Sequence, residues 1–448
     1  MENQKILEAH ERQLKFSRLL AKIGRNNPLG KLICLRAYFL DLPVLTQQWR
    51  DYLYVRKEQI SDKFLGLDQA IIHTSYADAK RLVETVPQQR DNYLGPLKIN
   101  ARSFFLGNPL SLGTNGNEHA GIRALFFHAL PKPEETTEVL ATLANQGLAS
   151  VAKQGTMNVK TDLPKIIVAL LHELVFNLKL SEAEIAGSAA YSANLGLATV
   201  PNIVHNTLLR KKTQPHIQHR QRLIESYKKS PKYQEYLAFG ATHQLNEQQV
   251  ANSLFDMIHV AGTAGTSDLL ASVFSVLCQN EPLRANVISE IDAVWNCQDT
   301  PNAQTLAQLQ LTEKVILETA RLYPPVRFLN QMSTEAMEVE IGGQRCPFQK
   351  GTRLVASVFT AHRDPKKYES PDTFKTTRDH SDILSWNGSN PERNCPGRAL
   401  SIALVKLFCL YALKHYQWRS FSGGEWDMKK FAPFKPNLVL DGFARRSD

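Results

Sequence analysis

The sequence predicts a mostly helical protein with a small β region, folded as one large domain over residues 1–448. Apolar residues recur mainly at helical spacing, and the stretches with strand character are short and few. Hydrophobic residues make up 43% of the chain, which is enough for a sizeable core. The length would also suit two or three domains, but no Gly/Ser-rich linker, low-complexity tract or internal repeat marks a boundary. We therefore expect a single large helical domain.

Local patterns place the main elements along the chain. Three short strands are predicted, at 70–73, 339–341 and 353–358, with Gly342 and Gly343 supplying a hairpin turn between two of them. Helical spacing predicts a long helix over 247–278 and shorter helices over 311–322 and 399–410. A strongly basic stretch, 209–222, contains Pro215 and is expected between helices.

A lone cysteine stands just before the last of these helices. Cys395 lies in the sequence Arg393-Asn394-Cys395-Pro396-Gly397-Arg398, and Pro396 suits the first helical position because its missing N–H costs nothing there. The helix dipole at this position lowers a thiol pKa and favours the thiolate, which can bind haem iron and promote O–O cleavage. The alternative is a free cysteine buried in the core. The helix itself is indicated by apolar residues that share one face: Leu400, Ala403, Leu404, Leu407 and Phe408.

Three further motifs lie upstream. Glu318 and Arg321 are three residues apart in the predicted helix 311–322, so they share a face and can pair. A turn-rich stretch that begins His362-Arg363-Asp364-Pro365 could bring Arg378 back to Glu318. His119 and Arg123 are four residues apart on one predicted helix face and could reach two anionic groups.

Together these motifs resemble the cytochrome P450 superfamily, from about Gly116 to the C-terminus. The resemblance implies the P450 fold and a haem b whose iron takes its axial thiolate from Cys395. It also implies that Glu318, Arg321 and Arg378 form a buried ion triad that fixes one structure more than it adds stability. The residues implied to contact the haem propionates are His119, Arg123 and Arg393, while Gln331 falls roughly where many members place a propionate-binding arginine.

Two segments depart from the usual family pattern. The cysteine loop, about 384–398, ordinarily begins F-x-x-G, but here Pro391 occupies the glycine position and Trp386 and Gly388 are displaced. The long distal helix ordinarily carries an acid followed by threonine, which feed protons to bound dioxygen. Here Ala264 replaces the acid and Gly265 replaces the first threonine.

Three functions remain compatible with these departures. Because heterolysis of an O–O bond needs protons from positioned groups, our leading hypothesis is an enzyme similar to allene oxide synthases and hydroperoxide lyases. Such an enzyme rearranges or cleaves a fatty-acid hydroperoxide without a reductase. The alternatives are a biosynthetic monooxygenase served by a ferredoxin or flavoprotein reductase, and a non-catalytic haem-thiolate protein that binds a small ligand.

The candidate groups for orienting oxygen are His259, Thr263 and Thr266, although a histidine in a long helix more often packs at a helix crossing.

The resemblance also suggests which residues line a pocket for an apolar or lipid-like substrate. Arg327 could meet a substrate carboxylate, a propionate or solvent. The aromatic residues Phe104, Phe105 and Phe434 could equally be ordinary residues of the hydrophobic core. The expected lining residues are Phe104, Phe105, Ala261, Gly262, Val326, Arg327 and Phe434.

Composition restricts the setting and the partners. The six cysteines show no paired spacing, which indicates reduced thiols in a cytoplasmic protein rather than a disulfide scaffold or zinc site. No apolar run approaches the ~20 residues that span a bilayer, and no signal peptide is evident.

The net charge of +10 mostly reflects solvated helix faces. The stretch 209–222 nevertheless suits a lipid surface or an anionic substrate, and 14–23 allows a weak amphipathic contact with a membrane surface. No motif supports binding to nucleic acid.

Overall fold

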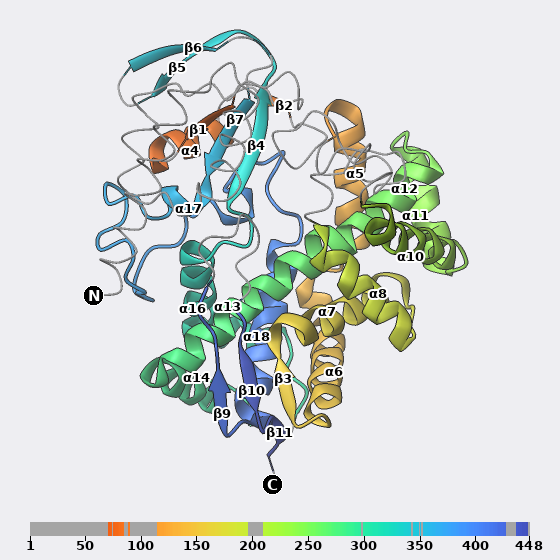
Figure 1. Ribbon diagram of the computed structural model, residues 1–448, viewed down its shortest axis with the longest axis vertical. Coiled ribbons are helices and arrows are strands. Elements are labelled where there is room, and N and C mark those ends of the chain that lie inside the picture. Colours follow the sequence, from red (N-terminus) through yellow and green to blue (C-terminus); the bar gives the residue numbers. More distant parts are fainter. Residues whose placement is uncertain are drawn as a thin grey trace.

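A computed structural model of the protein describes residues 70–73, 75–84, 88–89, 114–195, 209–296, 299–341, 344–348, 350, 353–426 and 436–446. Helices dominate this part of the chain, and short strands form four small sheets (Figure 1). The expected pocket residues Phe104, Phe105 and Phe434, and the segment 14–23, lie outside the described residues.

The helices before the distal helix are α4 (Tyr76–Glu84), α5 (Gly116–Ala129), α6 (Pro133–Ala152), α7 (Val159–Phe176), α8 (Glu182–Ala193), α10 (Arg210–Lys228) and α11 (Pro231–Thr242). The distal helix is formed by α12 (Glu247–Asp256), the π-helical segment η5 (Met257–Ala264) and α13 (Gly265–Gln279). It is followed by α14 (Glu281–Val294), α15 (Ala303–Gln308), α16 (Gln310–Leu322), α17 (Val358–Ala361), the 3₁₀ turn η6 (Ser385–Asn387) and α18 (Arg398–His415).

The largest sheet has the order β1-β7-β4-β2, with β1 (Ala70–His73) parallel to β7 (Arg353–Ser357). In the same sheet β4 (Phe328–Ser333) pairs antiparallel with β7 and with β2 (Gln88–Gln89). β5 (Met337–Ile341) and β6 (Gln344–Phe348) form an antiparallel hairpin. The prediction that the hairpin joins two of the three predicted strands is wrong, because 353–357 pairs with β1 and β4 and the partner of β5 is β6. The remaining strands are β3 (Thr156–Asn158), β8 (Tyr416–Gln417), β9 (Ser420–Ser422), β10 (Val439–Asp441) and β11 (Ala444–Arg445).

Two apolar clusters hold these elements together. The larger cluster lies among the helices and includes α5 to α7, the distal helix, α16 and α18. The smaller cluster joins α4 to the inner residues of β4 and β7, among them Leu329, Leu354 and Ala356. The distal helix runs diagonally between the sheet region and the main group of helices (Figure 1). The larger cluster thus includes residues of the distal helix, α16 and α18, and the smaller cluster includes Tyr368 and Leu384, which lie beside the His362 motif and in the cysteine loop.

The distal helix is continuous from Glu247 to Gln279, which confirms the predicted range to within one residue. Asn246 caps the start of this helix with a capping box. Its side chain accepts the Gln249 N–H, and the Gln249 side chain accepts the Asn246 N–H. Among the described residues it is the one helix with the length and apolar composition of a membrane span, but 72% of its most apolar window is buried inside the protein. It therefore packs as a core helix.

The basic stretch 209–222 was predicted to lie between helices, and this prediction is wrong. It forms most of α10, with Pro215 inside the first two turns. The helix forms because Ile217, Leu223 and Ile224 bury one face, and this packing outweighs the local cost of the proline. The predicted strand 353–358 ends one residue early, since Val358 begins α17.

Candidate active site

Cys395 lies three residues before α18, which begins at Arg398 with Gly397 as its N-cap. The prediction that Pro396 occupies the first helical position is therefore wrong, because the chain turns into the helix only at Gly397. The Cys395 N–H donates to the Trp386 carbonyl over 2.8 Å, which closes the cysteine loop. The carbonyl of Cys395 accepts the Arg398 N–H over 3.3 Å.

Cys395 is half-buried in the loop. Burial raises the pKa of the Cys395 thiol, and the Gly397 N–H and the guanidinium of Arg123 offset part of this rise. The helix terminus lowers this pKa as expected, through the Gly397 N–H, but the cost of burying the thiolate outweighs that contribution. A bound metal cation would supply the missing stabilisation of the thiolate.

The cysteine loop has an unusual backbone. Trp386, Asn387 and Gly388 follow one another with φ of 58°, 68° and 61°, a left-handed conformation that a bulky residue such as tryptophan rarely adopts. The Nδ2 group of Asn387 donates to the Arg393 carbonyl over 2.8 Å and spans the loop. The indole N–H of Trp386 donates to Ser401 Oγ over 3.1 Å, which attaches the loop to α18.

Asn390 joins the cysteine loop to α4 and was not identified from the sequence. Its Nδ2 group donates to the Val83 carbonyl over 2.6 Å, and its Oδ1 accepts the N–H groups of Glu392 and Arg393. The Asn390-Pro391 dipeptide is a turn signal that marks this position, although its long-range partner cannot be seen in the sequence. The loop is thus fastened to α4, which itself packs on β7 in the main sheet.

Three cationic or potentially cationic side chains surround the loop from α5 and from the loop itself. Arg123 donates to the Asn394 carbonyl over 2.6 Å, and a His119 ring nitrogen, Nε2, lies 3.1 Å from the Glu392 carbonyl. A guanidinium nitrogen of Arg393 lies 3.2 Å from His119 Nδ1. Burial lowers the pKa of both arginines. The structure thus gathers His119, Arg123 and Arg393 beside Cys395.

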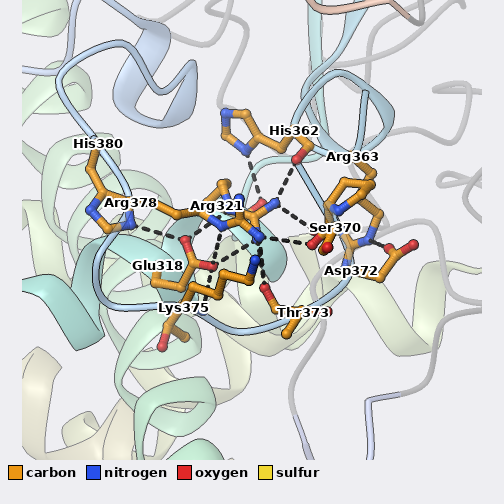
Figure 2. A network of polar contacts seen from close by, with 12 residues as sticks. Glu318, Arg321, His362, Arg363, Ser370, Asp372, Thr373, Lys375, Arg378 and His380 are labelled. Atoms are coloured by element: carbon orange, nitrogen blue, oxygen red, sulfur yellow. Dashed lines mark hydrogen bonds and ion pairs between the residues drawn. The ribbon is translucent and has the colours of Figure 1, made fainter. Parts of the chain in front are cut away.

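The structure also brings Glu318, Arg321 and Arg378 together (Figure 2). Arg321 donates to both carboxylate oxygens of Glu318 at 2.8 Å, and Arg378 Nε donates to Oε1 at 3.1 Å. His380, which was not identified from the sequence, adds a contact of 2.9 Å between its Nε2 and Glu318 Oε2. Burial raises the pKa of Glu318, but its hydrogen bonds from Arg321 and His380 prevail and lower it to about 2.

His362 connects this ion network to the cysteine loop. Its Nε2 accepts the Leu384 N–H over 2.8 Å, so its Nδ1 carries the proton and donates to the Arg321 carbonyl over 2.9 Å. Burial lowers the pKa of His362 to about 3, which keeps the ring neutral. A continuous path of hydrogen bonds therefore links Glu318 in α16 to the start of the cysteine loop.

Away from its two ends, the distal helix is exposed only near its centre. Between Val250 and Cys278 every residue is buried except five: Val260, Ala261, Gly262, Ala264 and Gly265. A Cβ added at Gly265 would meet no atom within 4 Å, whereas one at Gly262 would lie 2.6 Å from the Leu171 side chain in α7. Gly262 is therefore a packing position, while Ala261, Ala264 and Gly265 offer a small-residue surface that a flat ligand could approach. We call these five residues the distal window.

The candidate oxygen-orienting residues lie outside the distal window. His259 is fully buried, stacks on Phe255 with ring centres 3.8 Å apart, and contacts His172 and Tyr191 edge-on. Thr263 and Thr266 are also buried. The contacts of His259 are those of the packing alternative, at the crossing of the π-helical segment over α7 and α8.

Three other candidate residues lie near the start of β4. Val326 is 56% exposed, whereas Arg327 is buried with its guanidinium 5.5 Å from the Phe359 ring centre. Gln331 is 1% exposed, and neither end of its amide has a hydrogen-bond partner in the part of the chain that the structure describes. A buried amide without partners is costly unless a ligand or water engages it.

These features fit a haem. The half-buried thiol of Cys395 suits an iron ligand, the neighbouring arginines suit two propionates, and the open space at Gly265 in the distal window leaves room for a flat ligand. The unpartnered amide of Gln331 supplies a further polar contact. Among the described residues there is no group of three or more His, Cys, Asp or Glu side chains that would hold a bare metal ion instead.

Comparison with known proteins decides the family. A family model for cytochrome P450 matches residues 204–437, just over half of the chain. The chain is a cytochrome P450. The cofactor of this P450 is haem b, whose iron takes a cysteine thiolate as its axial ligand. The predicted superfamily and cofactor are thereby confirmed.

Several curated relatives share part of this P450. Premnaspirodiene oxygenase of Hyoscyamus muticus is 28% identical over 194 residues, which are 42% of this chain and 38% of the relative. (+)-Vincadifformine 19-hydroxylase of Catharanthus roseus is 28% identical over 37% of this chain and 34% of its own length. Cytochrome P450 3A29 of Sus scrofa is 30% identical over 39% and 35%. The matched segments thus span little more than a third of these relatives.

Solved structures match over a greater length. P450BioI, in complex with hexadec-9Z-enoic acid ligated acyl carrier protein, aligns with a TM-score of 0.66 at 17% identity, covering 88% of this chain and 97% of that one. The heme domain of a P450DA mutant aligns with the same score at 15% identity, covering 84% and 87%. At this identity the match shows the fold alone, and it confirms the predicted P450 fold.

Proposed function

We propose that this P450 is a monooxygenase that inserts oxygen into an apolar small molecule, with Cys395 as the iron ligand. The observation that carries the proposal is the distal window, which presents only aliphatic and glycine residues, Val260 to Gly262, Ala264 and Gly265. Such a surface excludes ordered water and binds hydrocarbon. The relatives support oxygen insertion, since their names describe an oxygenase and a hydroxylase.

The remaining site residues receive roles as part of this proposal. Arg123 and Arg393 hold the haem propionates as cations, and His119 and Gln331 add neutral hydrogen-bonding contacts. When bound, the haem supplies the site at which dioxygen is activated. The network around Glu318 holds the cysteine loop in place through His362, so its role is to position Cys395. Arg327 and Val326 are proposed to border the substrate.

Electron supply and cellular setting also belong to the proposal. Oxygen insertion consumes two electrons, which we assign to a ferredoxin or a flavoprotein reductase. A cytoplasmic location remains our prediction, and fractionation of the full-length protein tests it.

The test is turnover with named probes. The haem-loaded protein is incubated with NADPH, a reductase and one of three compounds taken from the relatives: premnaspirodiene, vincadifformine or hexadec-9Z-enoic acid. We expect NADPH-dependent formation of a product that is one oxygen heavier from at least one probe. Spectral shifts on ligand addition without any product would instead favour a non-catalytic haem-thiolate binding protein.

A second candidate function is favoured by Ala264 and Gly265. Neither of these distal-window residues can donate a proton, and a substrate that already contains an O–O bond would not need one there. The protein would then rearrange or cleave a fatty-acid hydroperoxide. Mixing it with such a hydroperoxide, without reductant, distinguishes the two: rapid catalytic loss of the conjugated diene supports this candidate, and bleaching of the haem alone excludes it.

A further inference from the structure

The chain contains two Asn-Gly dipeptides, Asn115-Gly116 at the start of α5 and Asn387-Gly388 in the cysteine loop. Both asparagine side chains contact Arg393. Asn115 Oδ1 accepts a guanidinium N–H of Arg393 over 3.0 Å, and Asn387 Nδ2 donates to its carbonyl over 2.8 Å. Asn-Gly is the sequence in which asparagine deamidates most readily, because glycine has no side chain to hinder its own backbone nitrogen. The fold thus places both dipeptides against one arginine of the site.

Deamidation is a reaction of the chain itself and needs only water. The backbone nitrogen of the glycine attacks the side-chain carbonyl carbon of the asparagine and forms a new C–N bond. The bond to the amide nitrogen breaks, and that nitrogen leaves as ammonia with the proton of the glycine N–H. The cyclic succinimide then adds water and opens to aspartate or isoaspartate, so nothing is oxidised or reduced.

The surroundings of Asn115-Gly116 leave this reaction open. Gly116 is exposed with φ of 59°, and a Cβ added there would meet no atom within 4 Å, so a ring has room to form. Gly116 is also the first residue of α5, where a backbone N–H has no partner within the helix. Its N–H makes no hydrogen bond to any residue that the structure describes. The attacking nitrogen is therefore available.

Arg393 activates the amide of Asn115. Although Asn115 is the N-cap of α5, its side chain makes no capping hydrogen bond. Its Oδ1 instead accepts from the Arg393 guanidinium, which is also held by the Thr114 carbonyl at 3.0 Å. A positioned cation of this kind polarises the amide carbonyl and stabilises the negative oxygen that forms when the carbon is attacked. The contact with Arg393 thus favours ring closure at Asn115.

The Asn387-Gly388 dipeptide has the same sequence and a similar glycine φ of 61°, but it is closed to the reaction. Asn387 is only 7% exposed. The Gly388 N–H donates to the carbonyls of Leu384 and Ser385 at 3.2 and 3.3 Å, so the nitrogen is engaged. Side chains of α4 lie within 4 Å of a Cβ built at Gly388, which leaves little room for a ring. The two dipeptides form an internal comparison in which the surroundings differ.

We propose that Asn115 is a deamidation site, and that the aspartate formed there weakens the hold of Arg393 on the haem. A carboxylate in place of the amide would pair with the guanidinium and compete with a propionate for its charge. Isoaspartate would also lengthen the backbone directly before α5, the helix that carries His119 and Arg123. The effect on haem rests on the proposed role of Arg393, whereas the modification itself does not.

The first test is peptide mapping by mass spectrometry. Haem-loaded protein kept in mildly alkaline buffer should accumulate aspartate and isoaspartate at position 115 while position 387 stays asparagine. In protein unfolded with urea, which is the control, both positions should convert at similar rates because the dipeptides are identical. Equal conversion at the two positions in the folded protein, or none at 115 after the unfolded chain has converted, would overturn the proposed site.

The second test introduces the product by substitution and measures haem retention. Asn115→Asp should speed the loss of haem to apomyoglobin several-fold. Asn117→Asp is the matched control, since Asn117 is exposed in the same turn of α5 and gains the same charge, and it should lose haem at the wild-type rate.

The two tests separate the modification, its effect and the proposed function. Haem loss at the wild-type rate in Asn115→Asp, or an equal increase in Asn117→Asp, would overturn the effect on haem, while mapping still decides whether Asn115 deamidates. Absence of NADPH-dependent turnover would overturn the monooxygenase function and would change neither result.

Discussion

Replacing Glu318 with glutamine should destabilise the protein strongly and in a pH-dependent way. The pKa of Glu318 falls from an ordinary 4.5 to about 2 in the folded protein, a difference of about 2.5 pH units. At 1.36 kcal/mol per unit, the folded state favours the charged carboxylate by about 3 kcal/mol. The side chain is completely buried, so solvent screening does not reduce this value. Removing one partner of a buried ion pair costs a similar amount in other proteins.

The sign of the pH dependence follows from the lowered pKa. Because the folded pKa lies below the unfolded one, the stabilisation is fully present above about pH 4.5 and is lost as the pH falls toward 2. The difference in free energy of unfolding between wild type and Glu318→Gln should therefore be about 3 kcal/mol at pH 7 and less than half of that near pH 3. Equilibrium urea unfolding, followed by circular dichroism, measures it at each pH.

A control variant keeps this prediction specific. Glu281 is 85% exposed and lies 3.9 Å from Arg284, so Glu281→Gln should change the stability by less than about 0.5 kcal/mol at any pH. A cost below about 1 kcal/mol for Glu318→Gln at pH 7, or a difference that stays constant with pH, would refute the reasoning.

Further predictions concern the distal helix and the cysteine loop. Gly262→Ala should lower the free energy of unfolding by about 1–3 kcal/mol, because the added Cβ would overlap Leu171. Gly265→Ala should not destabilise the protein, because its Cβ would meet no atom. Thermal unfolding compares the two variants. Ala264→Glu combined with Gly265→Thr should increase reductase-driven product formation and lower peroxide release. Asn390→Ala should cost about 1 kcal/mol and speed the loss of haem to apomyoglobin, because it removes the hydrogen bond that joins the cysteine loop to the Val83 carbonyl of α4.

Each of these predictions has an outcome that contradicts it. Equal stability of the Gly262 and Gly265 variants would mean that the distal window is wrongly located on the helix. An unchanged peroxide fraction in the double variant at 264 and 265 would show that proton delivery at these positions does not limit the reaction. Haem loss at the wild-type rate in Asn390→Ala would show that the contact with α4 does not hold the loop.

Regular elements could be predicted from the sequence because their signals are local. Helices α16 and α18 follow apolar faces at helical spacing and begin within one residue of the predicted positions. β1 lies at its predicted range. α10 was missed because Pro215 and a run of charges resemble a loop, whereas its stability comes from burial against other helices.

The parts of the site that could not be predicted depend on contacts between distant segments. His380 meets Glu318 across 62 residues, and Asn390 meets Val83 across 307 residues, and neither spacing forms a motif. The π-helical segment is equally invisible in the sequence, since its hydrogen-bond register depends on packing against α7 and α8. For the same reason, the sequence could not decide on which side of the helix His259 lies.

The most direct test of the account is the axial ligand. The reduced carbon monoxide complex of the wild-type protein should show the red-shifted Soret band of a thiolate-bound haem, and Cys395→Ser should lose that band. Cys278→Ala, a change at a cysteine buried in the core, is the control and should retain it. A thiolate band that persists in Cys395→Ser would contradict the assignment of Cys395 and, with it, the site described around the cysteine loop.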